Sequence, residues 1–260
     1  MILNDNQRRL LEERYQGIYS APELGYGTVR DYCDSCDHLP YLSNYQGDLK
    51  DFQRPWTVKA ILGTCLPGSS LLEFGAGEPI VGQMLSELGY LVTVVDPYDG
   101  SGNGPTEYDQ FRRLYTGVKI YREHFTAASD LAMKSFDCIY SVGVLEHLRE
   151  PALSAVFEGM RAFLKRHGVS VHCIDHVTAG RDSEFHRTNL IGILRHLSTL
   201  GKGADHDPAV QLSQLERAID QDLDTYYLSA SGHNLWRRRM PYDEYPFRRV
   251  VSILSCSRRV

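Results

Sequence analysis

A glycine-containing turn and an acidic residue about twenty positions later could together bind a nucleoside. The turn is Gly75-Ala76-Gly77, and it directly follows an apolar run of residues. Glycine lets the backbone turn sharply and approach a ligand closely. Asp96 ends the next apolar run, and a carboxylate at that place can accept hydrogen bonds from both hydroxyls of a ribose. Taken alone, the glycine turn would also fit a tight connection without a ligand.

A second group of residues with possible chemistry is the run His172-Cys173-Ile174-Asp175-His176. On a strand, His176 would share one face with His172, whereas Asp175 would point to the opposite face. Histidine has an ordinary pKa near 6.5 and therefore suits proton removal at neutral pH. We expect His176, with Asp175, to act as a base or to hydrogen-bond a substrate. A polar end of a strand without a catalytic role is the alternative.

Alternating strands and helices must position these groups. Apolar runs predict strands at 70–74, 91–95, 118–121, 136–141, 169–174 and 249–256. Helical spacing and end signals predict helices at 4–19, 56–65, 79–88, 107–115 and 151–166, the last with Lys165, Arg166 and His167 in its final turn. This alternation predicts an α/β fold with a doubly wound parallel sheet. Ligands of such sheets bind at the carboxyl ends of the strands.

The segments on either side of this alternation are predicted additions to it. Residues 1–55 are expected to form an N-terminal helical and irregular cap, and residues 56–260 the main domain. Residues 177–247 are a long insertion before the last strand, with apolar spacing that indicates helices near 190–197 and 212–219. The insertion is expected either to shape a substrate pocket or to add packing only.

Three motifs together resemble those of the class I S-adenosylmethionine-dependent methyltransferase family. They are EFGAG at 73–77, the aspartate Asp96 and FDCIYSVGVLEHL at 136–148, and the resemblance covers roughly residues 56–175. The set looks most like methyltransferases that act on small molecules. The resemblance implies a Rossmann-like, mostly parallel seven-stranded sheet, whose last strand lies antiparallel beside the fifth. It also implies S-adenosyl-L-methionine as the cofactor.

The resemblance further implies which residues would touch the cofactor. The glycine turn would line its methionine part, with Glu73 ordering the turn or meeting the amino group, and Asp96 would hold the ribose. Glu123 or His124 would bind the edge of the adenine, and Phe125 could stack on it. The residues that the resemblance places at the cofactor are Glu73, Gly75, Ala76, Gly77, Asp96, Pro97, Glu123, His124, Phe125, Ser141, Val142 and Glu146.

His147 is a further candidate base. The pair Glu146-His147 is common in such sequences as part of the framework, so a role at a helix start is the alternative for His147. His186 is a weaker candidate for the same chemistry.

Composition and charge exclude other classes of protein. The chain has 260 residues and a formal net charge of −5, which argues against a nucleic-acid binder. No apolar run approaches the roughly 20 residues that span a bilayer, and residues 1–9 become polar at once, so we expect no membrane partner and a cytoplasmic location. Cys33 and Cys36 have the spacing of a metal-binding pair, but no second pair exists; we therefore predict no metal site.

The predicted function is methyl transfer from S-adenosylmethionine to a small polar acceptor, with O-methylation in natural-product or saccharide metabolism expected. One alternative is an NAD-dependent oxidoreductase, although the third glycine of its G-x-G-x-x-G motif would fall at Ile80. The other alternative is a non-catalytic module that binds the cofactor and a partner protein. The sequence does not specify the acceptor or the oligomeric state.

Overall fold

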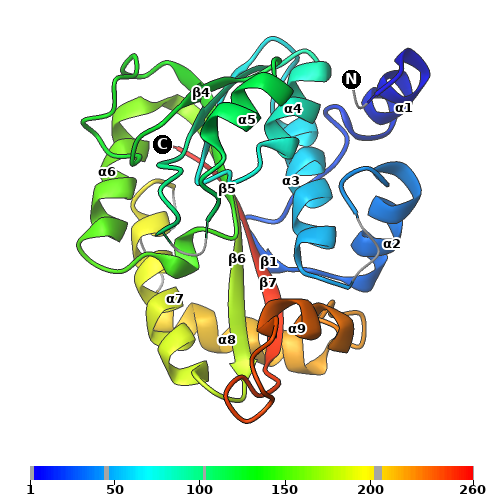
Figure 1. Cartoon of the computed structure of the whole chain (residues 1–260), viewed down its shortest axis with the longest axis vertical. Helices are drawn as coiled ribbons and strands as arrows, with labels where there is room; N and C mark the ends of the chain where they lie inside the picture. The colour runs from blue at the N-terminus through cyan, green and yellow to red at the C-terminus, as the bar shows by residue number, and fades with distance from the viewer. Residues whose placement is uncertain (1–2, 44–46, 102–103, 202–206, 260) are drawn as a thin grey trace.

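The computed structural model describes residues 3–43, 47–101, 104–201 and 207–259. Its strands are β1 (Leu24–Tyr26), β2 (Ser70–Phe74), β3 (Leu91–Val95), β4 (Lys119–Tyr121), β5 (Phe136–Val142), β6 (Leu164–Ala179) and β7 (Arg249–Arg258). They form one seven-stranded sheet in the order β1-β7-β6-β5-β2-β3-β4 (Figure 1). Strands β2 to β6 run parallel to their neighbours, β7 is antiparallel to β6, and β1 is antiparallel to β7. The predicted doubly wound, mostly parallel α/β sheet is therefore confirmed.

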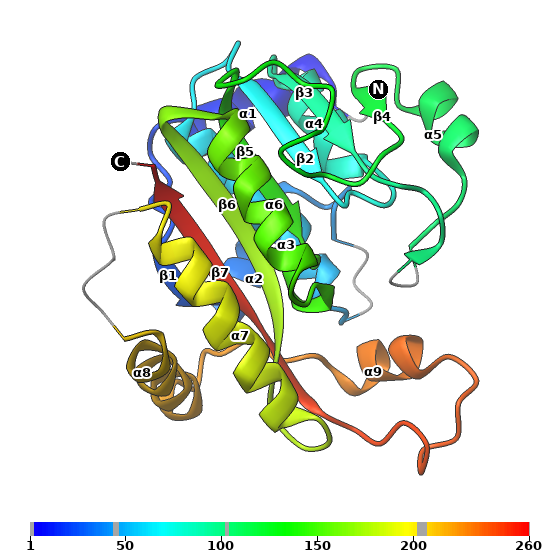
Figure 2. The same ribbon diagram turned by 90° about the vertical axis from the view of Figure 1, so that its left-hand side faces the viewer.

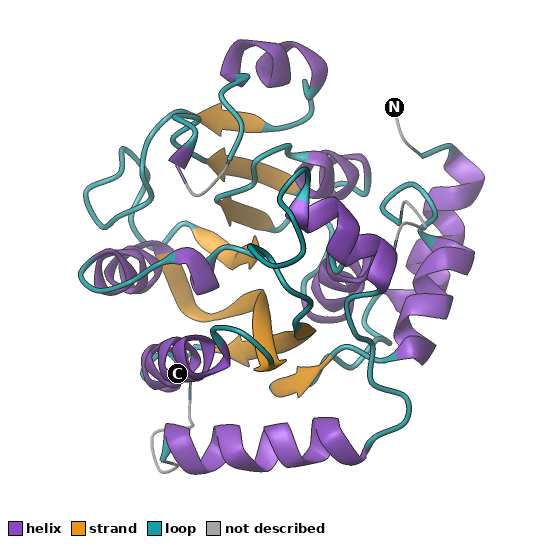
Figure 3. Cartoon of the chain, turned by 60° about the horizontal axis from the view of Figure 1, so that its bottom comes forward, coloured by secondary structure: helices purple, strands orange, loops and turns teal. Residues whose placement is uncertain are grey.

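Helices cover both faces of this sheet, with α6 and α7 on one face and α3 on the other (Figures 2 and 3). The helices before the insertion are α1 (Asp5–Tyr15), α2 (Val29–His38), α3 (Lys50–Thr64), α4 (Ile80–Glu87), α5 (Tyr108–Leu114), the 3-10 turn η2 (Leu145–His147) and α6 (Ala152–Phe163). Those of the insertion are α7 (Ser183–Ser198), α8 (Pro208–Gln221) and α9 (Ala230–Arg237). The two helices predicted in the insertion correspond to α7 and α8.

Neighbouring residues of a central strand pack into different helical layers. Leu71 of β2 belongs to the hydrophobic cluster that contains Trp56 of α3, and Leu72 belongs to the cluster that contains Phe157 of α6. All four side chains are fully buried. Because both faces of the strand are covered, its two neighbouring leucines are both apolar, which a strand with one solvent-facing side would not favour.

The helix predicted at 151–166 is too long, and the strand after it is too short. Helix α6 ends at Phe163, and β6 begins at Leu164, which pairs with Phe136 of β5. Lys165 extends from this strand to the carboxylate of Asp137, with Nζ 2.9 Å from both oxygens. Pairing with β5, which is distant in sequence, thus outweighs the local helical pattern that predicted a helix through His167.

The N-terminal segment contributes to the main sheet. Strand β1 arises from a stretch that was expected to be irregular, and it pairs with β7. Helix α3 begins at Lys50, before Pro55, and so crosses the domain boundary predicted after residue 55. Proline lacks a backbone N–H and disfavours helix in the residue before it, which explains why the sequence predicted a later start. The division into cap and main domain stays a prediction.

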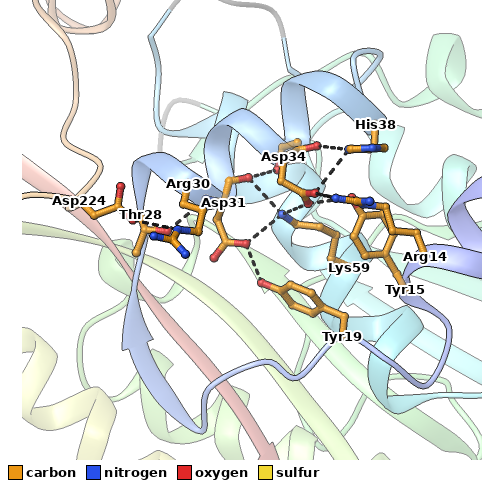
Figure 4. A network of polar contacts seen from close by, with 11 residues as sticks. Arg14, Tyr15, Tyr19, Thr28, Arg30, Asp31, Asp34, His38, Lys59 and Asp224 are labelled. Atoms are coloured by element: carbon orange, nitrogen blue, oxygen red, sulfur yellow. Dashed lines mark hydrogen bonds and ion pairs between the residues drawn. The ribbon is translucent and has the colours of Figure 1, made fainter.

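A buried lysine joins the first three helices (Figure 4). Lys59 of α3 is fully buried, and its Nζ donates to Asp31 Oδ1 at 3.1 Å and to Asp34 Oδ2 at 3.0 Å. Tyr19 donates to Asp31, and Tyr15 donates to Asp34. A buried cation with such partners is costly to leave unpaired, so the network should hold α2 against α3.

Replacing Lys59 with methionine is expected to lower the free energy of unfolding by about 3–5 kcal/mol, because Asp31 and Asp34 would lose the cation between them. Urea denaturation measures this loss. The control is Arg9→Ala, which breaks the exposed pair with Glu13, whose side chains are 64% and 59% exposed. That change should cost about 0.5 kcal/mol or less. A Lys59→Met protein as stable as the Arg9→Ala protein would contradict a stabilising network.

The same network predicts a loss of stability in acid. Burial raises the pKa of Asp34, but hydrogen bonds from Arg14 and Tyr15 and the charge of Lys59 outweigh it and lower this pKa to about 2. The ionised carboxylate therefore stabilises the fold above its unfolded-state pKa near 3.9, and this contribution is lost as the pH falls toward about 2. The free energy of unfolding should fall less steeply between about pH 5 and about pH 3 for Asp34→Asn than for the unaltered protein. Equal slopes would be inconsistent with the lowered pKa.

Candidate active site

The turn after β2 has a backbone that requires glycine. Gly75 has φ +65° and Gly77 has φ +58°, both in the left-handed region. A Cβ atom on Gly75 would lie 2.8 Å from both methyl groups of Val144, which closes over the turn from the loop after β5. At Gly77 the nearest atom to a Cβ would be in Pro105, at 3.6 Å. Ala76 between them is half-buried. The turn therefore exposes little but backbone, which allows close approach of a ligand.

Asp96 is tied to this glycine turn. Its Oδ2 accepts a hydrogen bond from the Gly77 N–H at 2.9 Å, and its Oδ1 accepts one from the Tyr98 N–H at 2.9 Å. The residue is only 7% exposed, and burial raises its pKa despite these hydrogen bonds. Each carboxylate oxygen can accept a further hydrogen bond, so the positioned group can still accept two hydroxyl donors. Pro97, which follows it, is half-buried.

Glu73 lies inside the protein, one residue before the end of β2. Its Oε2 accepts a hydrogen bond from the Tyr140 hydroxyl at 3.0 Å, and a Cβ on Gly82 of α4 would lie 2.9 Å from the same oxygen. Burial raises the pKa of Glu73 to about 7. These contacts fit the first of its two predicted roles, which was to order the turn between β2 and α4.

Glu123, His124 and Phe125, in the loop after β4, differ in their surroundings. Phe125 is buried, and its ring stacks on Phe74 with a centroid distance of 5.1 Å, so the side chain packs in the core. His124 is exposed, with Nε2 3.5 Å from Asp99 Oδ2. Glu123 has one buried carboxylate oxygen without a hydrogen-bond partner among the described residues. Glu123 and His124 are therefore better placed than Phe125 to meet an adenine.

The end of β5 brings two further predicted residues to the same edge of the sheet. The side chain of Ser141 is occupied, because its Oγ lies 2.9 Å from Nδ1 of the buried His172. Burial lowers the pKa of His172 to about 3, so this imidazole is neutral at ordinary pH. The carbonyl oxygen of Val142 accepts a hydrogen bond from Lys50 Nζ at 2.6 Å.

The structure separates Asp175 from His176. Asp175 Oδ1 accepts a hydrogen bond from Gln53 Nε2 of α3 at 2.5 Å. His176 is fully buried on the opposite face, where its Nε2 lies 3.2 Å from Glu216 Oε1 of α8. Arg187 of α7 forms an ion pair with the same glutamate. The two residues therefore do not meet at one point, as the expectation of a joint catalytic role required.

Asp175 is close enough to the other two candidate histidines, His147 and His186, to influence them electrostatically. Its charge acts to raise the pKa of both His147 and His186, although burial is the larger effect and lowers the pKa of each. His147 lies in η2, with a side chain that is 58% exposed, and His186 is half-buried in α7. Asp175 lies two residues beyond Cys173, where β6 last pairs with β5. Asp175, His147 and His186, called the Asp175 group below, thus lie at the edge of the sheet where the parallel strands end.

Lys50 and Gln53 also belong to this site, and the sequence did not point to them. Both are in the first turns of α3, before the proline that delayed the predicted helix start. They are three residues apart and therefore lie on one side of the helix. Had the sequence predicted a helix that begins at Lys50, this spacing would have pointed to both residues.

A family model described as "Methyltransferase domain" matches residues 45–206, more than half of the chain. No curated protein sequence matches this chain significantly. Among solved structures, phosphoethanolamine N-methyltransferase 2 of Haemonchus contortus, bound to phosphomonomethylethanolamine and S-adenosylhomocysteine, is 12% identical with a TM-score of 0.50, over 99% of this chain and 74% of that chain.

Two further solved structures have lower TM-scores. Geranyl diphosphate C-methyltransferase of Streptomyces coelicolor A3(2) is 14% identical with a TM-score of 0.48, over 99% of this chain and 100% of that chain. A TehB-like S-adenosylmethionine-dependent methyltransferase of Corynebacterium glutamicum is 16% identical with a TM-score of 0.43, over 87% and 97%. At such identities a likeness shows the fold alone.

The chain belongs to the methyltransferase-domain family. It is a class I methyltransferase with a Rossmann-like sheet, and its cofactor is S-adenosylmethionine, as the three motifs predicted. The family match does not support the alternative of an NAD-dependent oxidoreductase. Within the described residues, the structure contains no helix with the length and apolar character needed to cross a membrane.

The residues at the rim fit this cofactor. The left-handed turn at Gly75 and Gly77 offers backbone to an amino acid moiety, and the fixed carboxylate of Asp96 keeps lone pairs for two ribose hydroxyls. The unpartnered oxygen of Glu123 is a ready acceptor for the adenine amine. When bound, S-adenosylmethionine supplies an electrophilic methyl group on a sulfonium and leaves as S-adenosylhomocysteine.

Proposed function

We propose that this methyltransferase methylates a hydroxyl oxygen of a small polar molecule that binds beside Asp175. The observation that carries the proposal is the juxtaposition of the glycine turn and the Asp175 group. Val144 packs over Gly75, and Glu146 and His147 follow it directly in η2. A methyl group bound at the turn would therefore lie near the polar groups of this loop.

His147 is the proposed base, and Asp175 the proposed positioning residue. The pKa of the His147 imidazole is lowered because the surrounding protein partly desolvates this half-exposed ring, so the ring is neutral and able to accept a proton at ordinary pH. The imidazole takes the hydroxyl proton as the oxygen attacks the methyl carbon, and the carboxylate of Asp175 stabilises the resulting imidazolium. His176, on the other face, is proposed to support α8 instead.

The cofactor-binding roles are proposed for residues whose geometry fits them. Asp96 would accept the ribose hydroxyls, Glu123 or His124 the adenine edge, and Gly75 to Gly77 would line the methionine moiety. Glu73 is proposed to order the turn from within. Ser141 and Val142 would border the site through their backbone, because the Ser141 hydroxyl is occupied by His172.

An isotope-transfer screen tests the proposal. The protein is incubated with S-adenosylmethionine labelled in its methyl group and with fractionated small metabolites, and labelled products are identified by mass spectrometry. We expect a label on oxygen of a small hydroxyl-bearing molecule. A label on nitrogen or carbon would overturn the oxygen assignment. Cofactor binding without any labelled product would favour the non-catalytic module.

A further inference from the structure

Glu146 is a buried carboxylate that no side chain in the described structure hydrogen-bonds. The residue is 5% exposed, and neither carboxylate oxygen has a hydrogen-bond partner among the described residues. Nε2 of His147 is 3.8 Å from Oε1, which is beyond hydrogen-bonding distance. The backbone N–H groups of Glu146 and Asp175 act on the carboxylate, but less than burial and the charge of Asp175 do. A buried, unpaired carboxylate is costly, so its presence at the rim of the sheet calls for a ligand.

The carboxylate lies where an acceptor would meet the cofactor. A Cβ on Gly143, directly after β5, would be 3.2 Å from Glu146 Oε1 and would overlap with Lys50 Nζ. Gly143 has φ +65°, which keeps this position free of a side chain. Two residues before Glu146, Val144 contacts the glycine turn at Gly75. Glu146 thus joins the proposed cofactor turn to the Asp175 group.

The charges that face Glu146 favour a cation. Asp175 of β6 is the neighbouring charge with the largest effect on it, and it opposes ionisation of Glu146. Lys50 of α3 is a cation that acts on Glu146, but its Nζ already donates to the Val142 carbonyl at 2.6 Å. From α7, the neutral side chain of Asn189 donates to the backbone oxygen of Glu146 and leaves the carboxylate free. Asp48, near Asp175, adds a third acid.

We propose that Glu146 and Asp175 bind an ammonium group of the acceptor, so that the substrate class is a small hydroxyl-bearing amine. This inference rests on the proposed function, because it assigns a substrate class to the same site. An ammonium donates three hydrogen bonds and carries the charge that two adjacent carboxylates need. An anionic acceptor would be repelled by these acids, and a neutral acceptor would leave the cost of ionising Glu146 uncompensated.

The proposal has a consequence for protons. Burial, together with the charge of Asp175, raises the pKa of Glu146 well above its usual range, which favours the protonated carboxyl in the free site. A bound ammonium would favour the ionised form, so binding would release a proton and tighten as the pH rises toward that raised pKa. Proton release can be measured by calorimetry in two buffers of different ionisation enthalpy.

The test uses matched ligands that differ in one end group. With the protein saturated by S-adenosylhomocysteine, tyramine is compared with tyrosol and 4-hydroxyphenylacetate, and ethanolamine with ethylene glycol and glycolate. In at least one series, we expect the amine to bind about tenfold or more tighter than the alcohol and the acid. Glu146→Gln should remove most of that preference. Glu158→Gln, an exposed carboxylate on α6, should preserve it.

Each outcome has a clear meaning. A preference for the amine that is lost in Glu146→Gln supports the inference. No preference in either series, or a preference unchanged in Glu146→Gln, overturns it while leaving methyl transfer intact. If Glu146→Gln does not fold, as judged by thermal unfolding, Asp175→Asn takes its place. S-adenosylhomocysteine is titrated first, because absence of its binding would refute the proposed function itself.

Discussion

Replacing His147 with alanine is expected to lower kcat by about 10²–10⁴-fold, the usual effect of removing a general base. The affinity for S-adenosylhomocysteine should change little, because the cofactor is proposed to bind at the glycine turn and Asp96. The unaltered enzyme should lose activity in acid, as protonation removes the base. Since burial lowers the pKa of His147, that loss should occur below the ordinary histidine pKa of about 6.5. Steady-state rates across this pH range, with the acceptor found by isotope transfer, measure both effects.

His176→Ala is the matched comparison for this prediction. His176 is a second histidine of the same region, but it lies on the other face of the sheet, against Glu216. Its loss should reduce stability and leave the acid limb of the rate profile in place. A folded His176→Ala protein that lost as much activity as His147→Ala would return the catalytic role to His176.

Replacing Asp96 with asparagine is expected to weaken the binding of S-adenosylhomocysteine by about 10–150-fold. Hydrogen bonds to a charged group contribute about 1.5–3 kcal/mol. In addition, the amide NH₂ of asparagine would face either the Gly77 N–H or the Tyr98 N–H, whose hydrogen bonds the Asp96 carboxylate accepts. Isothermal calorimetry measures the dissociation constant. Thermal unfolding shows whether the variant retains its fold.

Asp99→Asn is the control, since it makes the same change three residues later. Asp99 is exposed and hydrogen-bonds the Ser101 N–H within its own loop. Its replacement should change the dissociation constant by no more than about twofold, as expected for an exposed charge. Equal weakening by the two substitutions would show that loop charge, rather than a specific carboxylate, governs binding.

The core of the fold was predictable because its signals are local. The central parallel strands are largely buried and read as short, mostly apolar runs, and the helices between them follow a helical apolar spacing. The glycine turn and Asp96 were predictable for the same reason. Their roles depend on the ends of two adjacent strands, which the pairing of β2 with β3 brings together.

Features that depend on distant pairing could not be predicted. Strand β1 contains only Leu24–Tyr26, and it exists because β7, more than two hundred residues later, offers an edge. The early start of β6 at Leu164 likewise depends on β5. Neither segment carries a pattern of its own that distinguishes it from loop or helix.

The residues of the proposed catalytic site were only partly predictable. Strand alternation already indicated opposite faces for Asp175 and His176, but the sequence did not show which face is the site. That choice depends on Gln53, which holds Asp175 from α3, and on Glu216, which holds His176 from α8. Both partners lie far away along the chain.

The central claim is that the glycine turn and Asp96 form the binding site of the cofactor. Titration of ligand-free, folded protein with S-adenosylhomocysteine by isothermal calorimetry tests it most directly. The account predicts saturable binding of one molecule per chain, strongly weakened by Asp96→Asn and retained in Asp99→Asn. Absence of measurable heat with both S-adenosylhomocysteine and S-adenosylmethionine, or binding that Asp96→Asn leaves unchanged, would contradict it.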